Sequence, residues 1–119
     1  MVETSPTITS ILTSIKKLLG VASTDTSFDT DIIMDINSAL MTLQQLGVGP
    51  STGFYISSDA EEWADLLVDR IDLEAVKIYI FLKTKLVFDP PQNSFLVESI
   101  KNQISELEFR INIQAEGGA

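Results

Sequence analysis

Two consecutive prolines divide the second half of this sequence. Pro90 and Pro91 follow Asp89, and neither proline has a backbone N–H to donate, so no helix or strand can continue through them. Proline also pushes the residue before it out of helical backbone angles. The chain must therefore turn at Asp89-Pro90-Pro91, and we expect the long apolar segments on either side to pack together as a hairpin.

The segment before the turn is predicted to be a helix from Leu73 to about Phe88, with Asp72 as its cap. Its interior is apolar on nearly every side, which is typical of a central, buried helix. The run is also rich in strand-favouring residues. However, it is longer than most strands, and its cap and its proline stop favour a helix.

The segment after the turn is predicted to be a second long helix, for which Gln92-Asn93-Ser94 supplies capping groups. Its apolar residues recur three and four positions apart, as Val97, Ile100, Ile104, Leu107 and Ile111. This spacing forms the seam of a helix that lies along a near-parallel or antiparallel partner. The simplest partner is the helix over residues 73–88.

The start of the chain predicts another helix, opened by Ser5-Pro6-Thr7 and ended by Gly20. One face of this helix carries the apolar residues Ile8, Ile11, Leu12, Ile15, Leu18 and Leu19. A further helix is predicted to begin with Asp29 as its N-cap, to pack Phe28 on Ile33, and to keep helical period as far as Leu46.

A capping box is formed by Ser58 and Glu61, and it predicts a short helix that carries Trp63 and ends near Asp69. The patterns together predict an all-α fold: a small helical bundle of about five helices with a long antiparallel C-terminal helical hairpin. We expect one domain over residues 1–119, with a flexible N-terminus over 1–7 and a flexible tail over 114–119.

Composition removes most kinds of chemistry, because the sequence has no cysteine and no histidine. These residues supply the commonest nucleophiles, general bases and transition-metal ligands, so neither an enzyme nor a cofactor is expected. The net charge of −9 opposes specific binding to a phosphate backbone, although it suits a surface that DNA passes without sticking. No segment approaches the ~20 uninterrupted apolar residues that span a bilayer. The N-terminus lacks the features of a secretory signal, so a cytoplasmic start is expected.

Two acidic clusters have structural interpretations that are stronger than the chemical ones. Asp25, Asp29, Asp31 and Asp35 crowd a helix start, where the helix dipole favours acids. A calcium loop beginning at Asp25 would need glycine and glutamate where Thr30 and Ile36 stand. The second cluster is Glu61, Glu62 and Asp65, and capping with a solvated face explains it better than acid–base catalysis does.

Two apolar features are candidate contact surfaces. Phe54 and Tyr55 lie in a glycine-flanked loop. The second set, Phe109, Ile111 and Ile113, lies near the C-terminus, where a monomer is usually polar. The alternative, that both sets cover the domain's own core, stays open for each of them.

Several motifs resemble those of one protein family. The first half carries Lys16-Lys17-Leu18-Leu19-Gly20, Phe28-Asp29, Ile36-Asn37-Ser38-Ala39-Leu40 and Leu46-Gly47-Val48-Gly49. The second half carries Val76-Lys77-x-Tyr79, Leu86-Val87-Phe88-Asp89-Pro90-Pro91, Ser94-Phe95 and a closing run over residues 104–112. The chain resembles the head–tail connector proteins of long-tailed bacteriophages, which are also called adaptor or head-completion proteins.

The resemblance implies a helical virion subunit, usually one of twelve in a ring beneath the portal of the capsid. This ring would form the neck between capsid and tail, would be assembled in the host cytoplasm, and would let genomic DNA pass without specific binding. It implies no cofactor and no catalytic residue. The implied partners are the portal protein, engaged by the C-terminal region with Phe109, Ile111 and Ile113, and a tail-side stopper or tail-completion protein.

Two other classes of function remain as alternatives. An acidic regulatory or DNA-mimic protein that binds a host enzyme would need a continuous outer acidic stripe, whereas the acids here fall mainly at helix starts and on mixed faces. A small hydrolase would depend on Glu61 or Glu62, for which no positioned partner is evident.

Overall fold

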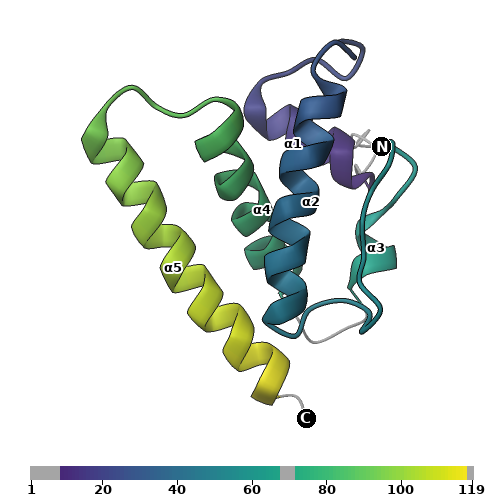
Figure 1. Ribbon diagram of the computed structural model, residues 1–119, viewed down its shortest axis with the longest axis vertical. Helices are drawn as coiled ribbons and strands as arrows, with labels where there is room; N and C mark the ends of the chain where they lie inside the picture. Colours follow the sequence, from purple (N-terminus) through teal and green to yellow (C-terminus); the bar gives the residue numbers. More distant parts are fainter. Residues whose placement is uncertain (1–8, 68–71, 118–119) are drawn as a thin grey trace, which may run out of the picture.

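The computed structural model describes residues 9–67 and 72–117, which form five helices (Figure 1). The helices are α1 (Ile11–Leu19), α2 (Asp29–Gln45), α3 (Trp63–Leu66), α4 (Leu73–Phe88) and α5 (Ser94–Gly117). The described residues form no strand, and their one isolated β-bridge joins Ser10 to Glu62. The predicted all-α fold with about five helices is therefore confirmed. No helix in this part of the chain is long and apolar enough to cross a membrane.

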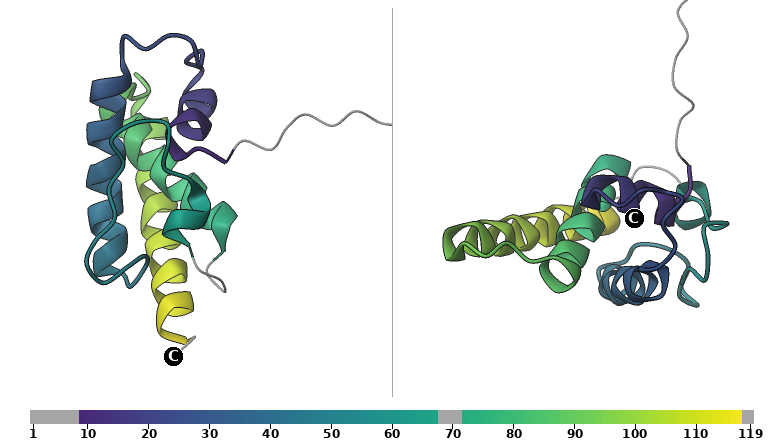
Figure 2. Two further views of the ribbon diagram at one scale, coloured as in Figure 1. Left: turned by 90° about the vertical axis from the view of Figure 1, so that its right-hand side faces the viewer. Right: turned by 90° about the horizontal axis from the view of Figure 1, so that it is seen from above.

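Helix α4 lies at the centre and contacts α1, α2 and α5 (Figures 1 and 2). Its buried residues include Val76, Tyr79 and Ile80, none of which is exposed to solvent. Asp72 caps α4 as predicted, because its Oδ1 accepts hydrogen bonds from the backbone N–H groups of Glu74 and Ala75. The predicted central position of this helix is confirmed, although the described residues leave one of its sides partly uncovered.

Helix α5 packs along α4 and confirms the predicted C-terminal hairpin. After the proline turn, Asn93 Oδ1 accepts hydrogen bonds from the N–H groups of Phe95 at 2.7 Å and Leu96 at 3.3 Å, which caps α5. The first turn of α5 stands away from the rest of the molecule (Figures 1 and 2). The helix also continues to Gly117, through residues that the sequence had assigned to a flexible tail.

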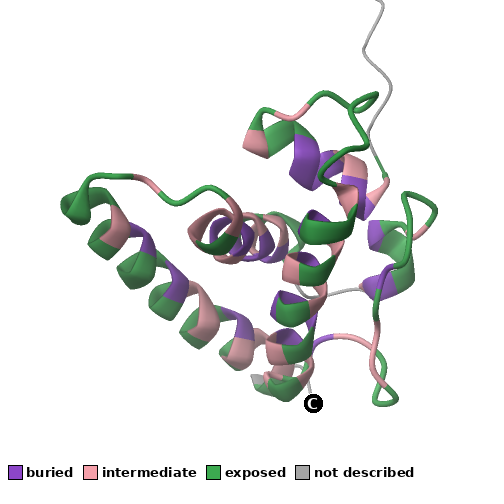
Figure 3. Ribbon diagram, turned by 45° about the horizontal axis from the view of Figure 1, so that its top comes forward, coloured by how far each residue is buried: buried purple, intermediate pink, exposed green. Residues whose placement is uncertain are grey.

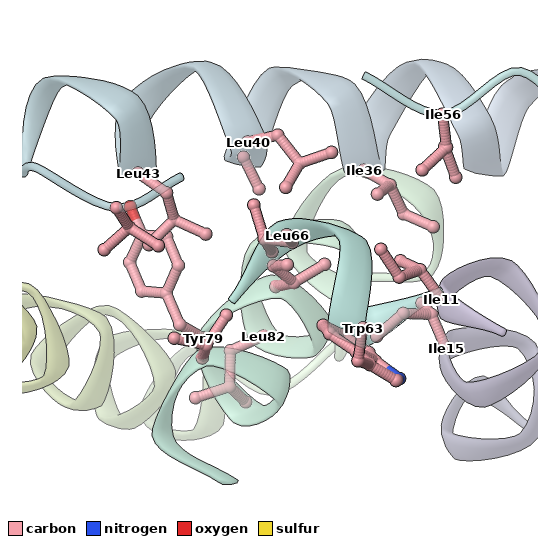
Figure 4. Close-up of a cluster of buried hydrophobic side chains, with 14 of the residues drawn as sticks. Ile11, Ile15, Ile36, Leu40, Leu43, Ile56, Trp63, Leu66, Tyr79 and Leu82 are labelled. Atoms are coloured by element: carbon pink, nitrogen blue, oxygen red, sulfur yellow. The ribbon is translucent and has the colours of Figure 1, made fainter. Parts of the chain in front are cut away.

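The core gathers apolar side chains from all five helices and from the segment between α2 and α3. Figure 4 shows part of it, with residues of α1, α2, α3 and α4 labelled. In Figure 3 the buried residues of each helix form a stripe on the side that faces the neighbouring helices. Tyr79 is buried among them, and its hydroxyl donates to Glu108 Oε2 at 2.7 Å, which joins α4 to α5. Burial, together with the hydrogen bond to Glu108, raises the pKa of Tyr79 far above its ordinary value.

The start of α1 differs from the prediction. The helix begins at Ile11, and Ser10 caps it by accepting a hydrogen bond from the N–H of Thr13 at 3.2 Å. The predicted cap at Ser5-Pro6-Thr7, the residue Ile8 and the N-terminus expected to be flexible all lie outside the described residues. The predicted end at Gly20 is confirmed, because this residue has a φ of 83°, a conformation that glycine adopts at little cost.

The prediction that Asp29 caps α2 is wrong, because its carboxylate faces Lys16 instead. The distance between Lys16 Nζ and Asp29 Oδ1 is 2.8 Å, and the Lys16 side chain is almost fully buried. The same ammonium group donates to the backbone carbonyls of Asp25 and Ser23. This lysine therefore joins the end of α1 to the start of α2.

The capping box predicted at Ser58 and Glu61 forms only in part, and the helix start predicted there is wrong. The Glu61 carboxylate accepts hydrogen bonds from the N–H groups of Ser57 and Ser58 and so closes the loop before the helix. Helix α3 begins later, where the N–H of Glu62 donates to Asp65 Oδ2 at 2.9 Å, and it ends at Leu66. The predicted end near Asp69 lies outside the described residues.

Candidate interaction surfaces

Two of the acidic side chains near the start of α2, those of Asp25 and Asp29, serve the chain's own structure. Asp29 pairs with Lys16, and Asp25 accepts hydrogen bonds from the side chain and the backbone of Ser27, which lower the pKa of Asp25. Among the described residues, no three acidic side chains are arranged to hold a metal ion. The contacts thus support the structural interpretation for Asp25 and Asp29, while Asp31 and Asp35 lie at the surface pocket described below.

The second acidic cluster is likewise used for capping and loop closure. Burial raises the pKa of Glu61, but the hydrogen bonds from Ser57 and Ser58 outweigh it and bring the pKa below its usual value. Glu62 Oε2 accepts a hydrogen bond from the Thr9 hydroxyl at 3.2 Å. These carboxylates hold the loop against the start of α1, an arrangement that serves structure.

The C-terminal apolar set is divided by the structure. Phe109 is 68% exposed and Ile113 is 50% exposed, and they lie four residues apart on one face of α5. Ile111 has no exposed surface, because a residue two positions from each of them points to the other side of a helix. We call Phe109 and Ile113 the C-terminal patch, while Ile111 belongs to the core.

The loop set is divided in the same way. Tyr55 is exposed, whereas Phe54 packs partly buried against the core. The next residue, Ile56, is buried, because the Asn37 side chain accepts from its N–H at 2.8 Å and donates to its carbonyl at 2.9 Å. This pair of hydrogen bonds holds the loop against α2, so the predicted loop surface is reduced to Tyr55.

Sequence reasoning missed the apolar start of α5. Phe95 is 85% exposed and Leu96 is also exposed. Phe95 and Ile113 are 18 residues apart, which is about five full helical turns, so the two residues lie on the same outer stripe of α5. The sequence does indicate this stripe, because Phe95 and Ile113 fall outside the apolar seam that runs from Val97 to Ile111.

A further apolar surface lies where the start of α2 meets the end of α4. A pocket of about 430 Å³ opens there, lined by Phe28, Asp31, Met34, Asp35, Val87 and Phe88. The Phe28 and Phe88 rings meet edge to face at 5.5 Å. Met34 and Val87 are largely exposed at its rim, so apolar atoms and carboxylates are presented together.

The carboxylates of both acidic clusters that have hydrogen-bond or ion-pair partners serve the chain's own loops and helix ends, while exposed apolar side chains gather on the outer sides of its helices. Such a molecule belongs to the class of helical structural subunits that act through contact with other proteins. Residues 11–118 match the family model described as phage connector protein, and the chain belongs to this family. The resemblance seen in the sequence is confirmed. This structural family implies a non-enzymatic role.

Searches among curated proteins and among solved structures found no significant match to this chain.

Proposed function

We propose that this protein forms a ring between the portal and the tail-side proteins of a phage, where it completes the head and continues the DNA channel. Membership of the connector family supports this function. The observation that carries it is the outer stripe of α5, where Phe95, Phe109 and Ile113 stay exposed although the chain has a buried apolar core of its own. Exposed apolar residues that share one helix face are typical of a surface covered by another protein.

In this proposal the C-terminal patch contacts the portal protein. The structure supports a contact through Phe109 and Ile113, because aromatic and aliphatic side chains on a rigid helix lose little conformational freedom on binding. Arg110 lies beside them, with its guanidinium 3.3 Å from Glu106 on the same helix. The buried Ile111 supports the patch by anchoring this part of α5 to the core.

Tyr55 is proposed as a contact for the next protein on the tail side, the stopper or tail-completion protein. Its neighbours Phe54 and Ile56 pack on the core, so the exposed ring of Tyr55 stands on a supported loop. The acidic net charge of −9 suits a channel through which DNA moves without specific binding. The site of action in this proposal is the virion neck, after assembly of a homo-oligomeric ring, usually of twelve subunits, in the host cytoplasm.

Electron microscopy and native mass spectrometry of the chain, alone and with its portal protein, test this function. We expect rings on the portal, and no ring together with no co-migration would refute the proposal. Ile113→Asp is expected to weaken portal binding, while Met41→Asp serves as a matched control. Met41 is 52% exposed, close to Ile113 at 50%, but it lies on α2 outside the proposed contact.

A further inference from the structure

One side of the central helix is left partly uncovered by the residues that the structure describes. Helices α1, α2 and α5 pack on α4, yet Ile78 is 43% exposed and Phe81 is only half-buried. Lys77 and Lys85 flank these two residues, and at about 100° per residue all four lie on one side of the helix. We call Lys77, Ile78, Phe81 and Lys85 the open face of α4. A helix that is apolar all round is normally covered all round.

The two cations of the open face have contacts within the chain. Lys77 Nζ lies 5.8 Å from the centroid of the Trp63 ring, and Lys85 Nζ donates to the backbone carbonyl of Asp89 at 3.3 Å. Lys77 Nζ lies 3.8 Å from the Glu74 carboxylate, and Lys85 Nζ lies 3.6 Å from that of Asp89. Both acids are largely exposed, and ion pairs of this kind contribute little to stability. Because the acids they pair with are exposed and weakly held, each ammonium group can exchange its acid for a carboxylate of a neighbouring molecule.

A complementary surface exists on the same chain. The pocket between α2 and α4 presents Met34, 65% exposed, and Val87, 69% exposed, beside the carboxylates of Asp31 and Asp35. None of the residues that line it is a lysine or arginine, and the sequence has no cation from residue 18 to residue 69. Burial and the nearby Asp31 raise the pKa of Asp35, so a cation brought to this pocket would relieve an unfavourable charge.

The two surfaces point in different directions. Val87 at the pocket and Ile78 on the open face are nine residues apart, which places them about 180° apart around α4. Figure 2 shows α2 along one face of the molecule with α4 behind it. One copy can therefore offer its pocket to one neighbour and its open face to another. Contacts of this head-to-tail kind close into a ring when the rotation per subunit allows it.

We infer that the open face of α4 in one subunit docks against the acidic pocket between α2 and α4 of the next subunit. Ile78 and Phe81 meet Met34 and Val87 in the centre, and Lys77 and Lys85 meet Asp31 and Asp35 around them. The apolar centre supplies affinity, and the charges fix the orientation of the subunits. This inference rests on the proposed ring and names the surfaces that build it.

Charge reversal tests the pairing directly. We expect Asp31→Lys with Asp35→Lys, and separately Lys77→Glu with Lys85→Glu, to weaken self-association by more than about tenfold each. An equal mixture of the two variants should assemble at close to the wild-type level, because every contact in an alternating ring again joins opposite charges. Native mass spectrometry of the variants, free and on the portal, measures this, and melting curves by circular dichroism check that each variant is folded.

The outcomes separate this inference from the function on which it rests. The docking inference is refuted, and the proposed ring function stands, if the wild-type chain forms rings and each charge variant also forms them alone. The same holds if the mixture of the two variants assembles no better than either variant alone. If the wild-type chain forms no ring, free or on the portal, both fail. Should a charge variant not fold, Met34→Ser and Ile78→Ser replace the pair, with Met41→Ser as the control that should assemble normally.

Discussion

Replacing Lys16 with methionine is expected to lower the free energy of unfolding by about 2 to 4 kcal/mol. The methionine keeps the apolar stem but removes the ammonium group that lies 2.8 Å from Asp29 Oδ1. It also leaves the backbone carbonyls of Ser23 and Asp25 without this donor. Breaking a fully buried ion pair costs about 3 to 5 kcal/mol. The Asp29 side chain is 26% exposed, so water recovers part of that cost.

Urea unfolding followed by circular dichroism measures this change. For a domain of this size the dependence on urea is about 1 to 3 kcal/mol per molar, so the midpoint should fall by on the order of 1 to 2 M. Lys17→Met is the matched control, since this neighbouring lysine is exposed and its replacement should change stability by less than about 0.5 kcal/mol. Asp29→Asn added to Lys16→Met should restore part of the loss, because it removes the uncompensated charge. Equal midpoints for Lys16→Met and Lys17→Met would contradict the argument.

Three further predictions use the same unfolding measurements. Ile111→Ala should lower the free energy of unfolding by about 2 to 5 kcal/mol, because it leaves a cavity at a buried site. Ile113→Ala on the exposed patch should lower it by less than about 0.5 kcal/mol. Equal losses would mean that the two residues are not divided between core and surface as described. Thr84→Val should be neutral or stabilising by up to about 1 kcal/mol, since the buried Thr84 hydroxyl has no hydrogen-bond partner among the described residues. A clear loss of stability would show that the hydroxyl is satisfied. The folded-state pKa of Glu61 lies below the ordinary 4.5, so its carboxylate stabilises the fold above pH 4.5, and that contribution is lost as the pH falls through the folded-state pKa. Glu61→Gln should therefore melt below the wild type at pH 7 and together with it in strong acid, and a constant difference would refute this linkage.

Helix ends that depend on local sequence could be predicted, and those that depend on distant partners could not. Asp72 caps the N–H groups of the next few residues, and the left-handed Gly20 follows its own helix directly, so the necessary groups are all within one turn. Asp29 has the right residue type and position for a cap, but its carboxylate forms an ion pair with Lys16 of the previous helix instead. The buried Lys16 is a stronger partner than a backbone amide that water can also reach.

The candidate surfaces were predictable only in part, for a similar reason. Periodicity alone places Ile111 and Ile113 on opposite sides of a helix, so the sequence is sufficient to divide the C-terminal set. It could not divide the loop set, because burial of Ile56 depends on an amide side chain 19 positions earlier in the chain. The sequence could not reveal the partly uncovered side of α4, because this side is as rich in apolar residues as the buried sides.

Helix α4 therefore carries two kinds of apolar residue that composition cannot separate. Ile80 is fully buried within the chain, so removing its side chain should lower stability. Ile78 stands nearly half-exposed two residues away, so its removal should leave the free subunit stable and affect only association in the proposed ring. A protein that must fold alone and then assemble needs both sides of such a helix to be apolar. Unfolding of the free chain and assembly of the ring are thus separately measurable consequences of one short sequence, Ile78-Tyr79-Ile80-Phe81.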